Sequence, residues 1–245
     1  MSTFVLVPGA WHGGWWFRPL ARRLRDHGHE AYAVTLTGLG ERSPLLGGSV
    51  NLDTHIEDVV ALLTAEEIEN AVLVGHSYAG MVISGVADRA PGRVAALVYV
   101  DAFVPADGDS CWSLGNEVHR RWYIEGAEAD GWSVPPPPFF DPRTTRHPLA
   151  SFLQALRLAA ASDEVRRRDY VLLTGYEQNP FTHFYERVCH APGWLTHTLP
   201  TGHDVMAEAP EALLEIVLGA AARQGVEETP AGGGRPGREP VRPVQ

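Results

Sequence analysis

Short, continuously apolar runs alternate along the chain with longer segments in which apolar residues recur every three or four positions. Continuous runs of this kind are typical of parallel strands, which are buried on both faces of a sheet. Glycine or proline follows several of them, as expected where a strand gives way to a loop. The predicted strands are "TFVLV" at 3–7, "EAYAVTL" at 30–36, "AVLV" at 71–74, "VAALVYVDAF" at 94–103, "DYVLLTGY" at 169–176 and "WLTHTLPTG" at 194–202.

The longer segments predict helices that bury one apolar face. One of them opens with Thr54 three residues before Glu57, a capping-box spacing that predicts the start of the helix there. Because strands and helices alternate, we expect an α/β protein with a mostly parallel central sheet and helices on both faces. The predicted helices cover residues 14–28, 53–63, 79–89 and 209–223.

The alternation breaks after the strand that ends near Asp101, where "VPPPPFF" at 134–140 lies among several aromatic residues. A structureless loop of this length would be unusual inside a compact domain, so we expect a mostly helical cap inserted there. The end of the chain combines proline, glycine and charge without apolar anchors, which predicts a disordered tail. The expected organisation is a core formed by 1–103 and 169–224, a cap at 104–168 and a tail at 225–245.

Composition excludes several classes of partner and chemistry. A formal net charge of −10 provides no basic surface for nucleic acid. No basic leader precedes the first apolar run, and no stretch approaches the roughly 18 apolar residues of a membrane span. Cys111 and Cys189 cannot form a disulfide framework, so we expect a cytoplasmic protein. The chain contains no lysine, which excludes lysine Schiff-base chemistry and a lysine-bearing phosphate loop.

Ser77 lies where a buried-strand pattern stops and a helical pattern begins, in the segment Gly75-His76-Ser77-Tyr78-Ala79. In a nucleophile elbow, small residues two positions before and after the serine let the strand and the helix approach each other, and the sharp turn exposes the hydroxyl. Ala79 stands where glycine is usual, but alanine is still small. Serine also caps helices well, so a purely structural role is the alternative. The strand before it and the helix after it favour the elbow.

Such a serine needs hydrogen-bond donors for a developing oxyanion. A loop after an early strand normally provides one backbone N–H, and the position directly after Pro8 and Gly9 assigns that donor to Ala10. Pro8 has no amide hydrogen and cannot serve. The backbone N–H of Tyr78, directly after Ser77, is the expected second donor.

The serine also needs a base. His203 lies in a glycine-containing loop after the last predicted strand and before the terminal helix, which is where an elbow serine finds its histidine. Three other histidines, His183, His190 and His197, share a seven-residue spacing but lack nearby cysteine pairs or paired carboxylates. We therefore expect no metal site.

Five segments carry a resemblance to a known family: "FVLVPGAWHGGWWF", "GHE" before "AYAVTLTG", "AVLVGHSYAGMV", "DAFVPADG" and "TGHDVMAEAPEAL". They resemble the α/β-hydrolases, and within them the plant-type methylesterases, salicylate-binding esterases and hydroxynitrile lyases with their bacterial relatives. The similarity runs from residue 3 to about 220 and is weakest in the cap. It implies an α/β-hydrolase fold, with Ser77 as nucleophile, His203 as base, and Ala10 and Tyr78 as oxyanion-hole donors.

The chain departs from this family at two places. The family usually has His-Gly in the first loop, where this chain has Pro8 and Gly9. Its acid usually follows the penultimate strand, but "LLTGYEQNPF" offers only Glu177 there. Some α/β-hydrolases take the acid from the end of the preceding strand instead, which is the position of Asp101. Both candidates keep the order serine, acid, histidine; the short side chain at a strand end favours Asp101, and Asp204 ranks third.

These residues predict a serine hydrolase that forms an acyl-enzyme without a metal, nucleotide or organic cofactor. The expected substrate is a small to medium, bulky or aromatic carboxylic ester. Aromatic side chains line apolar pockets through large contact areas and ring stacking. The candidate substrate-binding residues are therefore Trp11 after the first strand and Trp112 and Trp122 in the cap.

Two other classes of function fit the same fold. One is a non-hydrolytic enzyme of natural-product biosynthesis, such as a cyclase, a lyase or an epoxide-opening enzyme. Cyanohydrin cleavage is excluded, because hydroxynitrile lyases hold cyanide with a lysine and this chain has none. The other is a ligand-binding protein on a hydrolase scaffold. All three hypotheses imply a small-molecule partner without nucleic acid or membrane, and they leave the oligomeric state open, a homodimer included.

Overall fold

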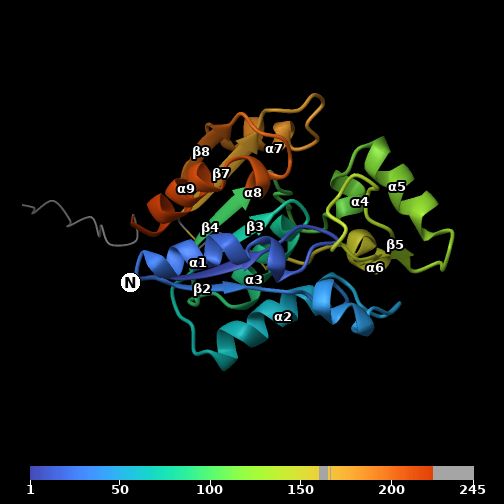
Figure 1. Ribbon diagram of the computed structural model, residues 1–245, viewed down its shortest axis with the longest axis horizontal. Helices are drawn as coiled ribbons and strands as arrows, with labels where there is room; N and C mark the ends of the chain where they lie inside the picture. The colour runs from blue at the N-terminus through green and yellow to red at the C-terminus, as the bar shows by residue number, and fades with distance from the viewer. Residues whose placement is uncertain (160–164, 166, 223–245) are drawn as a thin grey trace, which may run out of the picture.

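Six parallel strands form the central sheet of the computed structural model, which describes residues 1–159, 165 and 167–222 (Figure 1). The strand order is β2-β1-β3-β4-β7-β8, so the direction of growth reverses between β1 and β3. In parallel sheets, ligand sites lie outside the carboxyl ends of the strands at such a reversal. The strands are β1 (Thr3–Val7), β2 (Glu30–Ala33), β3 (Ala71–His76), β4 (Val94–Val100), β7 (Arg168–Leu173) and β8 (Trp194–Leu199).

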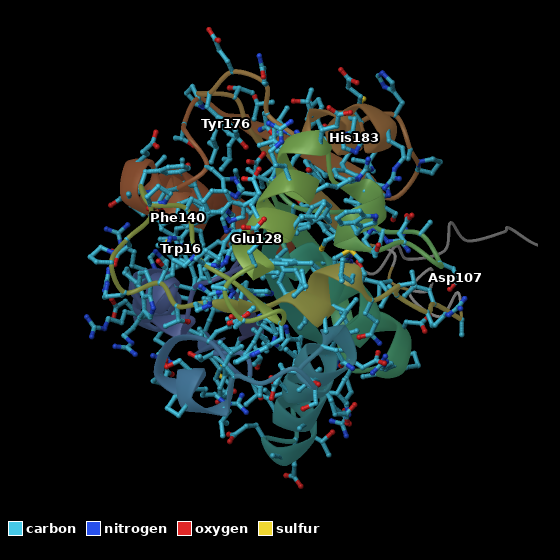
Figure 2. All side chains as sticks on the ribbon, turned by 90° about the vertical axis from the view of Figure 1, so that its right-hand side faces the viewer. Trp16, Asp107, Glu128, Phe140, Tyr176 and His183 are labelled. Carbon is cyan, nitrogen blue, oxygen red and sulfur yellow. The ribbon has the colours of Figure 1, made fainter. Side chains whose placement is uncertain are left out.

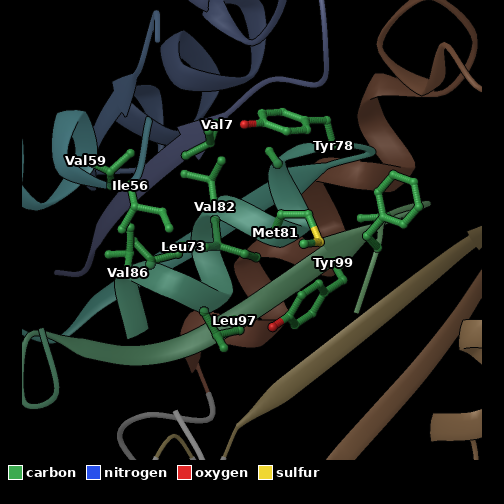
Figure 3. Packing of buried hydrophobic residues seen from close by; sticks show 14 of the residues in the cluster. Val7, Ile56, Val59, Leu73, Tyr78, Met81, Val82, Val86, Leu97 and Tyr99 are labelled. Carbon is green, nitrogen blue, oxygen red and sulfur yellow. The ribbon is translucent and has the colours of Figure 1, made fainter. Parts of the chain in front are cut away.

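Helices cover both faces of this sheet. They are α1 (Arg18–Asp26), α2 (Leu52–Ala65), α3 (Ala79–Arg89), α7 (Thr182–Val188), α8 (Val205–Glu208) and α9 (Pro210–Ala222), with short 3-10 turns at Gly14–Trp16 and Gly40–Leu45. Successive strand residues point to opposite faces: Val5 packs in the layer of α2 and α3, and Leu6 in that of α1 and α9. Figure 3 shows the first layer, with Val82 of α3 beside Leu73 of β3. Burial on both faces explains why the inner strands, such as β1 and β3, are continuously apolar, whereas the edge strands β2 and β8 are partly exposed.

The predicted α/β architecture is confirmed, with one local correction at the start of α2. The prediction that Thr54 and Glu57 form the capping box is wrong, because Asn51 is the N-cap residue. The Asn51 side chain accepts a hydrogen bond from the Thr54 N–H (3.0 Å), and the Thr54 hydroxyl accepts one from the Asn51 N–H (3.3 Å). The N-cap therefore lies three residues before Thr54, and the helix begins at the buried Leu52. Helix α7, between β7 and β8, was not predicted.

The segment between β4 and β7 forms a layer of its own on the side of the molecule away from the N-terminus (Figure 1). It is less helical than expected, because an antiparallel two-stranded sheet and a proline-rich stretch occupy much of it. The boundaries of core and cap stay a prediction. The elements of this insert are α4 (Cys111–Leu114), α5 (Glu117–Ala127), β5 (Ser133–Val134), β6 (His147–Pro148) and α6 (Leu149–Leu153).

The predicted tail at 225–245 lies outside the described residues. Over the part of the chain that the structure describes, no helix combines the length and apolar character needed to cross a bilayer.

The turn from β3 into α3 brings backbone segments very close together. A Cβ atom at Gly80 would overlap the carbonyl oxygen of Phe103, and one at Gly75 would lie 2.9 Å from that of Ala79. Both approaches are closer than real Cβ contacts, so either side chain would force the backbone to move. Alanine is tolerated at position 79 because the closest contacts between backbone segments in this turn lie at Gly75 and Gly80.

Replacing Gly80 by alanine should therefore lower the free energy of unfolding by at least about 3 kcal/mol, because a methyl group would overlap a backbone oxygen. Gly47→Ala is the control, since nothing lies within 4 Å of the place that its Cβ atom would take, and its effect should stay within about 0.5 kcal/mol. Urea unfolding of the two variants measures the difference. Equal stabilities would contradict the close approach of α3 to Phe103.

Candidate active site

Ser77 occupies the turn between β3 and α3 in a strained backbone conformation. Its φ is +55°, in the left-handed region that residues other than glycine rarely adopt. Its N–H donates to the carbonyl of Val100 (3.1 Å), and its carbonyl accepts from the N–H groups of Gly80 and Phe103 (both 3.2 Å). Such strain costs of order 1–3 kcal/mol and persists only where the surroundings fix it. The N-cap position of α3 is Tyr78, without a side-chain hydrogen bond, so the Ser77 hydroxyl does not cap this helix.

The loop after β1 lies directly against this turn. A Cβ atom at Gly9 would lie 3.0 Å from the Cβ of Ser77 and 2.8 Å from Nδ1 of His76, so only glycine permits this approach. Ala10, the next residue, is 4% exposed. Within the described residues, the amides of Ala10 and Tyr78 donate to no other protein group. Two backbone donors beside a serine are thus available to an oxygen atom of a ligand.

His203 follows β8 and is connected to both β4 and the Ser77 turn. Its Nδ1 lies 2.7 Å from Oδ2 of Asp101. Because a carboxylate accepts, Nδ1 carries the hydrogen, and Nε2 of the neutral ring holds the lone pair. The His203 carbonyl accepts a hydrogen bond from Nε2 of His76 (3.0 Å), the residue before Ser77. The structure therefore brings the predicted base to the turn that carries the predicted nucleophile.

Asp101 is fully buried and makes hydrogen bonds with both carboxylate oxygens. Oδ2 accepts from His203 and from the Tyr176 hydroxyl (2.6 Å), and Oδ1 accepts from Nδ2 of Asn179 (2.8 Å) and from the Leu173 N–H (3.3 Å). A buried charge is tolerated only when it is paired and hydrogen-bonded in this way. Tyr176 and Asn179 were missed in the sequence, although polar side chains at the end of a predicted strand and three residues beyond it were the available signal.

The two other acid candidates lie elsewhere. Glu177 is exposed on the loop after β7, and that loop supplies Tyr176 and Asn179 as donors to Asp101 in place of an acid. Asp204 is exposed, and its Oδ1 accepts from the indole N–H of Trp16 (3.0 Å) and, as N-cap of α8, from the Ala207 N–H (3.3 Å). Of the three carboxylates, Asp101 is therefore the one bonded to His203.

A pocket of about 220 Å³ lies beside His203. Trp16 stacks on His76 with ring centroids 4.4 Å apart, and His76 in turn packs against His203 at 4.4 Å. Figure 2, which looks onto the insert, shows Trp16 and Phe140 next to each other at this pocket. The lining is mostly aromatic and consists of His12, Trp16, His76, Phe139, Phe140, Asp141, His203 and Asp204.

The three tryptophans predicted to bind substrate do not line this pocket. Trp11 donates its indole N–H to the Val134 carbonyl (3.0 Å), and Trp122 donates to that of Pro135 (3.0 Å). Together with Trp112, they pack as half-buried residues against the main core. A role of these residues in substrate binding stays a prediction. Phe140 was missed because the loop that contains it follows no periodic pattern.

Several histidines around the site are buried or half-buried, which favours the neutral form of the ring. Burial lowers the pKa of His12, His76 and His147 below the usual value, and it lowers the pKa of His55 and His119 to about 4. No group of three or more potential metal ligands occurs among the described residues.

Sequence comparisons place this chain among hydrolases. The model of the alpha/beta hydrolase family matches residues 4–216. A carbendazim hydrolyzing esterase from Nocardioides sp. (strain SG-4G) is 40% identical over an alignment of 237 residues that covers 88% of this chain and 98% of that protein. Methyl jasmonate esterase 1 from Vitis vinifera is 30% identical over 128 residues, which are 52% of this chain and 48% of that protein.

Solved structures give the same fold. An extracellular alpha/beta-hydrolase from a Paenibacillus species, described as sharing structural and functional homology with tobacco salicylic acid binding protein 2, superimposes with a TM-score of 0.77. The match covers 90% of this chain and 99% of that structure at 21% identity. At this identity the likeness shows the fold alone.

The neutral state of His55 predicts a pH dependence of stability. Its pKa is about 4 in the folded chain and about 6.5 when unfolded, so between these values the unfolded chain binds one more proton. The contribution of this group to the free energy of unfolding is complete above about pH 6.5. As the pH is lowered from there towards 4, the free energy of unfolding falls by up to about 1.4 kcal/mol per pH unit. His55→Gln keeps a donor and an acceptor but cannot titrate. Urea unfolding between pH 4.5 and 6.5 should show a shallower slope for the variant, and identical slopes would contradict the assignment.

Proposed function

Given that this chain belongs to the alpha/beta hydrolase family, we propose that it is a serine-dependent carboxylic ester hydrolase. The observation that carries the proposal is the hydrogen bond between His203 and the buried Asp101, next to a serine in an elbow turn. Esterases among its relatives support the same class of reaction.

In the proposed mechanism, Nε2 of His203 takes the proton of Ser77 while Oγ attacks the carbonyl carbon of the ester. The carbonyl oxygen becomes an oxyanion, which the amides of Ala10 and Tyr78 stabilise. His203 then gives its proton to the departing alcohol, and an acyl-enzyme remains on Ser77. Water attacks this ester with His203 again as base, the acid is released, and the Ser77 hydroxyl is restored.

Asp101 acts on this cycle through His203. Its Oδ2 holds the Nδ1 hydrogen, which keeps Nε2 free to accept the Ser77 proton, and its negative charge stabilises the imidazolium that forms. The hydroxyl of Tyr176 and the amide of Asn179 fix the carboxylate in this orientation. We therefore propose Ser77, His203 and Asp101 as the catalytic triad.

The pocket beside His203 supports an aromatic substrate. Trp16, Phe139 and Phe140 contribute rings to its wall, and such rings favour planar apolar groups. The relative that is 40% identical is named for hydrolysing carbendazim, so we include carbendazim among the substrates to be tested, beside naphthyl and p-nitrophenyl esters of short acids.

Turnover should depend on Ser77. We expect Ser77→Ala to lower ester hydrolysis by at least about 10⁴-fold, because it removes the nucleophile. A fluorophosphonate should label the unsubstituted protein at Ser77 but not this variant, while substitution of an exposed serine, Ser49→Ala, serves as the control and should behave as the parent. Labelling without ester turnover would favour a non-hydrolytic enzyme. Absence of both would favour a ligand-binding protein.

The acid is tested by comparing Asp101→Asn with Glu177→Gln. Asp101→Asn should reduce kcat on the order of 10⁴-fold, because an amide at this position favours the wrong tautomer of His203. Glu177→Gln changes an exposed side chain and should leave kcat close to that of the parent. Steady-state kinetics on a p-nitrophenyl ester gives both values, and urea unfolding verifies that each variant is folded. Equal, mild losses would refute both assignments.

A further inference from the structure

Trp11 is the residue after Ala10. All the hydrogen bonds that the structure gives to Trp11 are made with residues of the insert between β4 and β7. The Trp11 N–H donates to Nδ1 of His147 (3.2 Å), its indole N–H donates to Val134 (3.0 Å), and its carbonyl accepts from the Thr145 N–H (2.9 Å). Trp11 has a φ of +66°, a conformation that a non-glycine residue keeps only when its surroundings fix it. The backbone next to Ala10 is therefore held by the insert, not by the sheet.

The same insert reaches the second expected oxyanion-hole residue. Nε2 of His147 lies 2.8 Å from Oγ of Ser151, and the His147 ring packs edge-on against the Tyr78 ring with centroids 4.7 Å apart. The Tyr78 hydroxyl lies 2.8 Å from Nδ1 of His55, whose Nε2 is 2.9 Å from the carbonyl of Thr37. His147, Ser151 and His55 are fully buried, and Tyr78 is 1% exposed. Figure 3 shows the Tyr78 ring beside Val7, the last residue of β1.

The partners fix the direction of these hydrogen bonds. An amide can only donate, so Nδ1 of His147 accepts from Trp11 and its Nε2–H donates to Ser151, whose hydroxyl donates onward to the Pro148 carbonyl (2.8 Å). A carbonyl can only accept, so Nε2–H of His55 donates to Thr37 and Nδ1 accepts from Tyr78. Both histidines must be neutral for this arrangement. Burial, which lowers the pKa of both, keeps them so at neutral pH.

We propose that His147 is a positioning residue, which holds the segments of Ala10 and Tyr78 so that their two amides converge on one oxygen atom. It acts through the backbone of Trp11 and the ring of Tyr78, without contact to the substrate, and its hydrogen bond to Ser151 fixes the orientation of its own ring. This inference rests on the proposed esterase function. It assigns to the insert a role in transition-state stabilisation, in addition to covering the sheet.

The position of the acceptor nitrogen provides a matched pair of variants. The side-chain oxygen of asparagine can take the place of Nδ1, so His147→Asn keeps an acceptor for the Trp11 N–H. The longer glutamine places its amide near the Nε2 position, so His147→Gln keeps the contact with Ser151 but loses that acceptor. His147→Phe loses both contacts.

Loss of one oxyanion-hole donor reduces kcat by about 10²- to 10³-fold, and misplacement should cost somewhat less. We expect kcat of His147→Gln and His147→Phe to fall roughly 10- to 100-fold with KM within about threefold, because the donors act in the transition state. His147→Asn should recover most of this loss. The affinity for a trifluoromethyl ketone, which forms a tetrahedral adduct with the serine, should fall in parallel with kcat/KM.

The outcomes separate this inference from the proposed function. An unsubstituted protein without ester turnover would refute the function itself. Normal turnover together with unchanged kcat in folded His147→Gln would refute only the positioning role. A raised KM at constant kcat would also overturn it, since His147 would then contact substrate. If His147→Phe does not fold, as judged by urea unfolding, the comparison of His147→Asn with His147→Gln decides.

Discussion

The buried carboxylate of Asp101 is the constraint around which the site edge of the sheet is organised. A fully buried charge requires hydrogen-bond donors on both oxygens. The donors come from the last residue of β7 and from the loops after β7 and β8: the Leu173 N–H, Tyr176, Asn179 and the His203 ring. Three strand ends that are separate in sequence are thereby connected through one side chain. The orientation of the His203 imidazole follows from that requirement.

Three residues with a strained backbone lie at the same edge. Trp11, Ser77 and Asp101 all have φ between +44° and +66°, and they follow β1, β3 and β4 in turn. Each is fixed by hydrogen bonds from neighbouring segments, which is how strained residues persist at functional sites. For Ser77 and Asp101 those partners include the adjacent strands, through Val100 and Val171. For Trp11 they belong to the insert, so the first loop depends on a part of the chain about 135 residues away.

Local patterns were sufficient to predict the architecture and the two residues at the centre of the proposed chemistry. Continuous apolar runs mark strands because both faces of the sheet are covered, and this holds for the inner strands β1, β3, β4 and β7, whereas the edge strands β2 and β8 are partly exposed. Ser77 was recognisable because an elbow requires small neighbours within five positions. His203 was recognisable from its loop between the last strand and the terminal helix. The insert was recognised only as a break in the pattern, because its two-stranded sheet and proline-rich stretch have no periodicity.

What the sequence alone determined is thus the six strands of the central sheet, four of the helices and their order, and it indicated the candidate residues whose signal is local: Ser77, His203 and the loop of Ala10. Only the tertiary structure distinguished Asp101 from Glu177, because that depends on which loop faces His203 once β4, β7 and β8 lie side by side. It also revealed Tyr176, Asn179 and His147. Their significance comes from contacts with residues distant in sequence, and no local pattern of apolar and polar positions records such contacts.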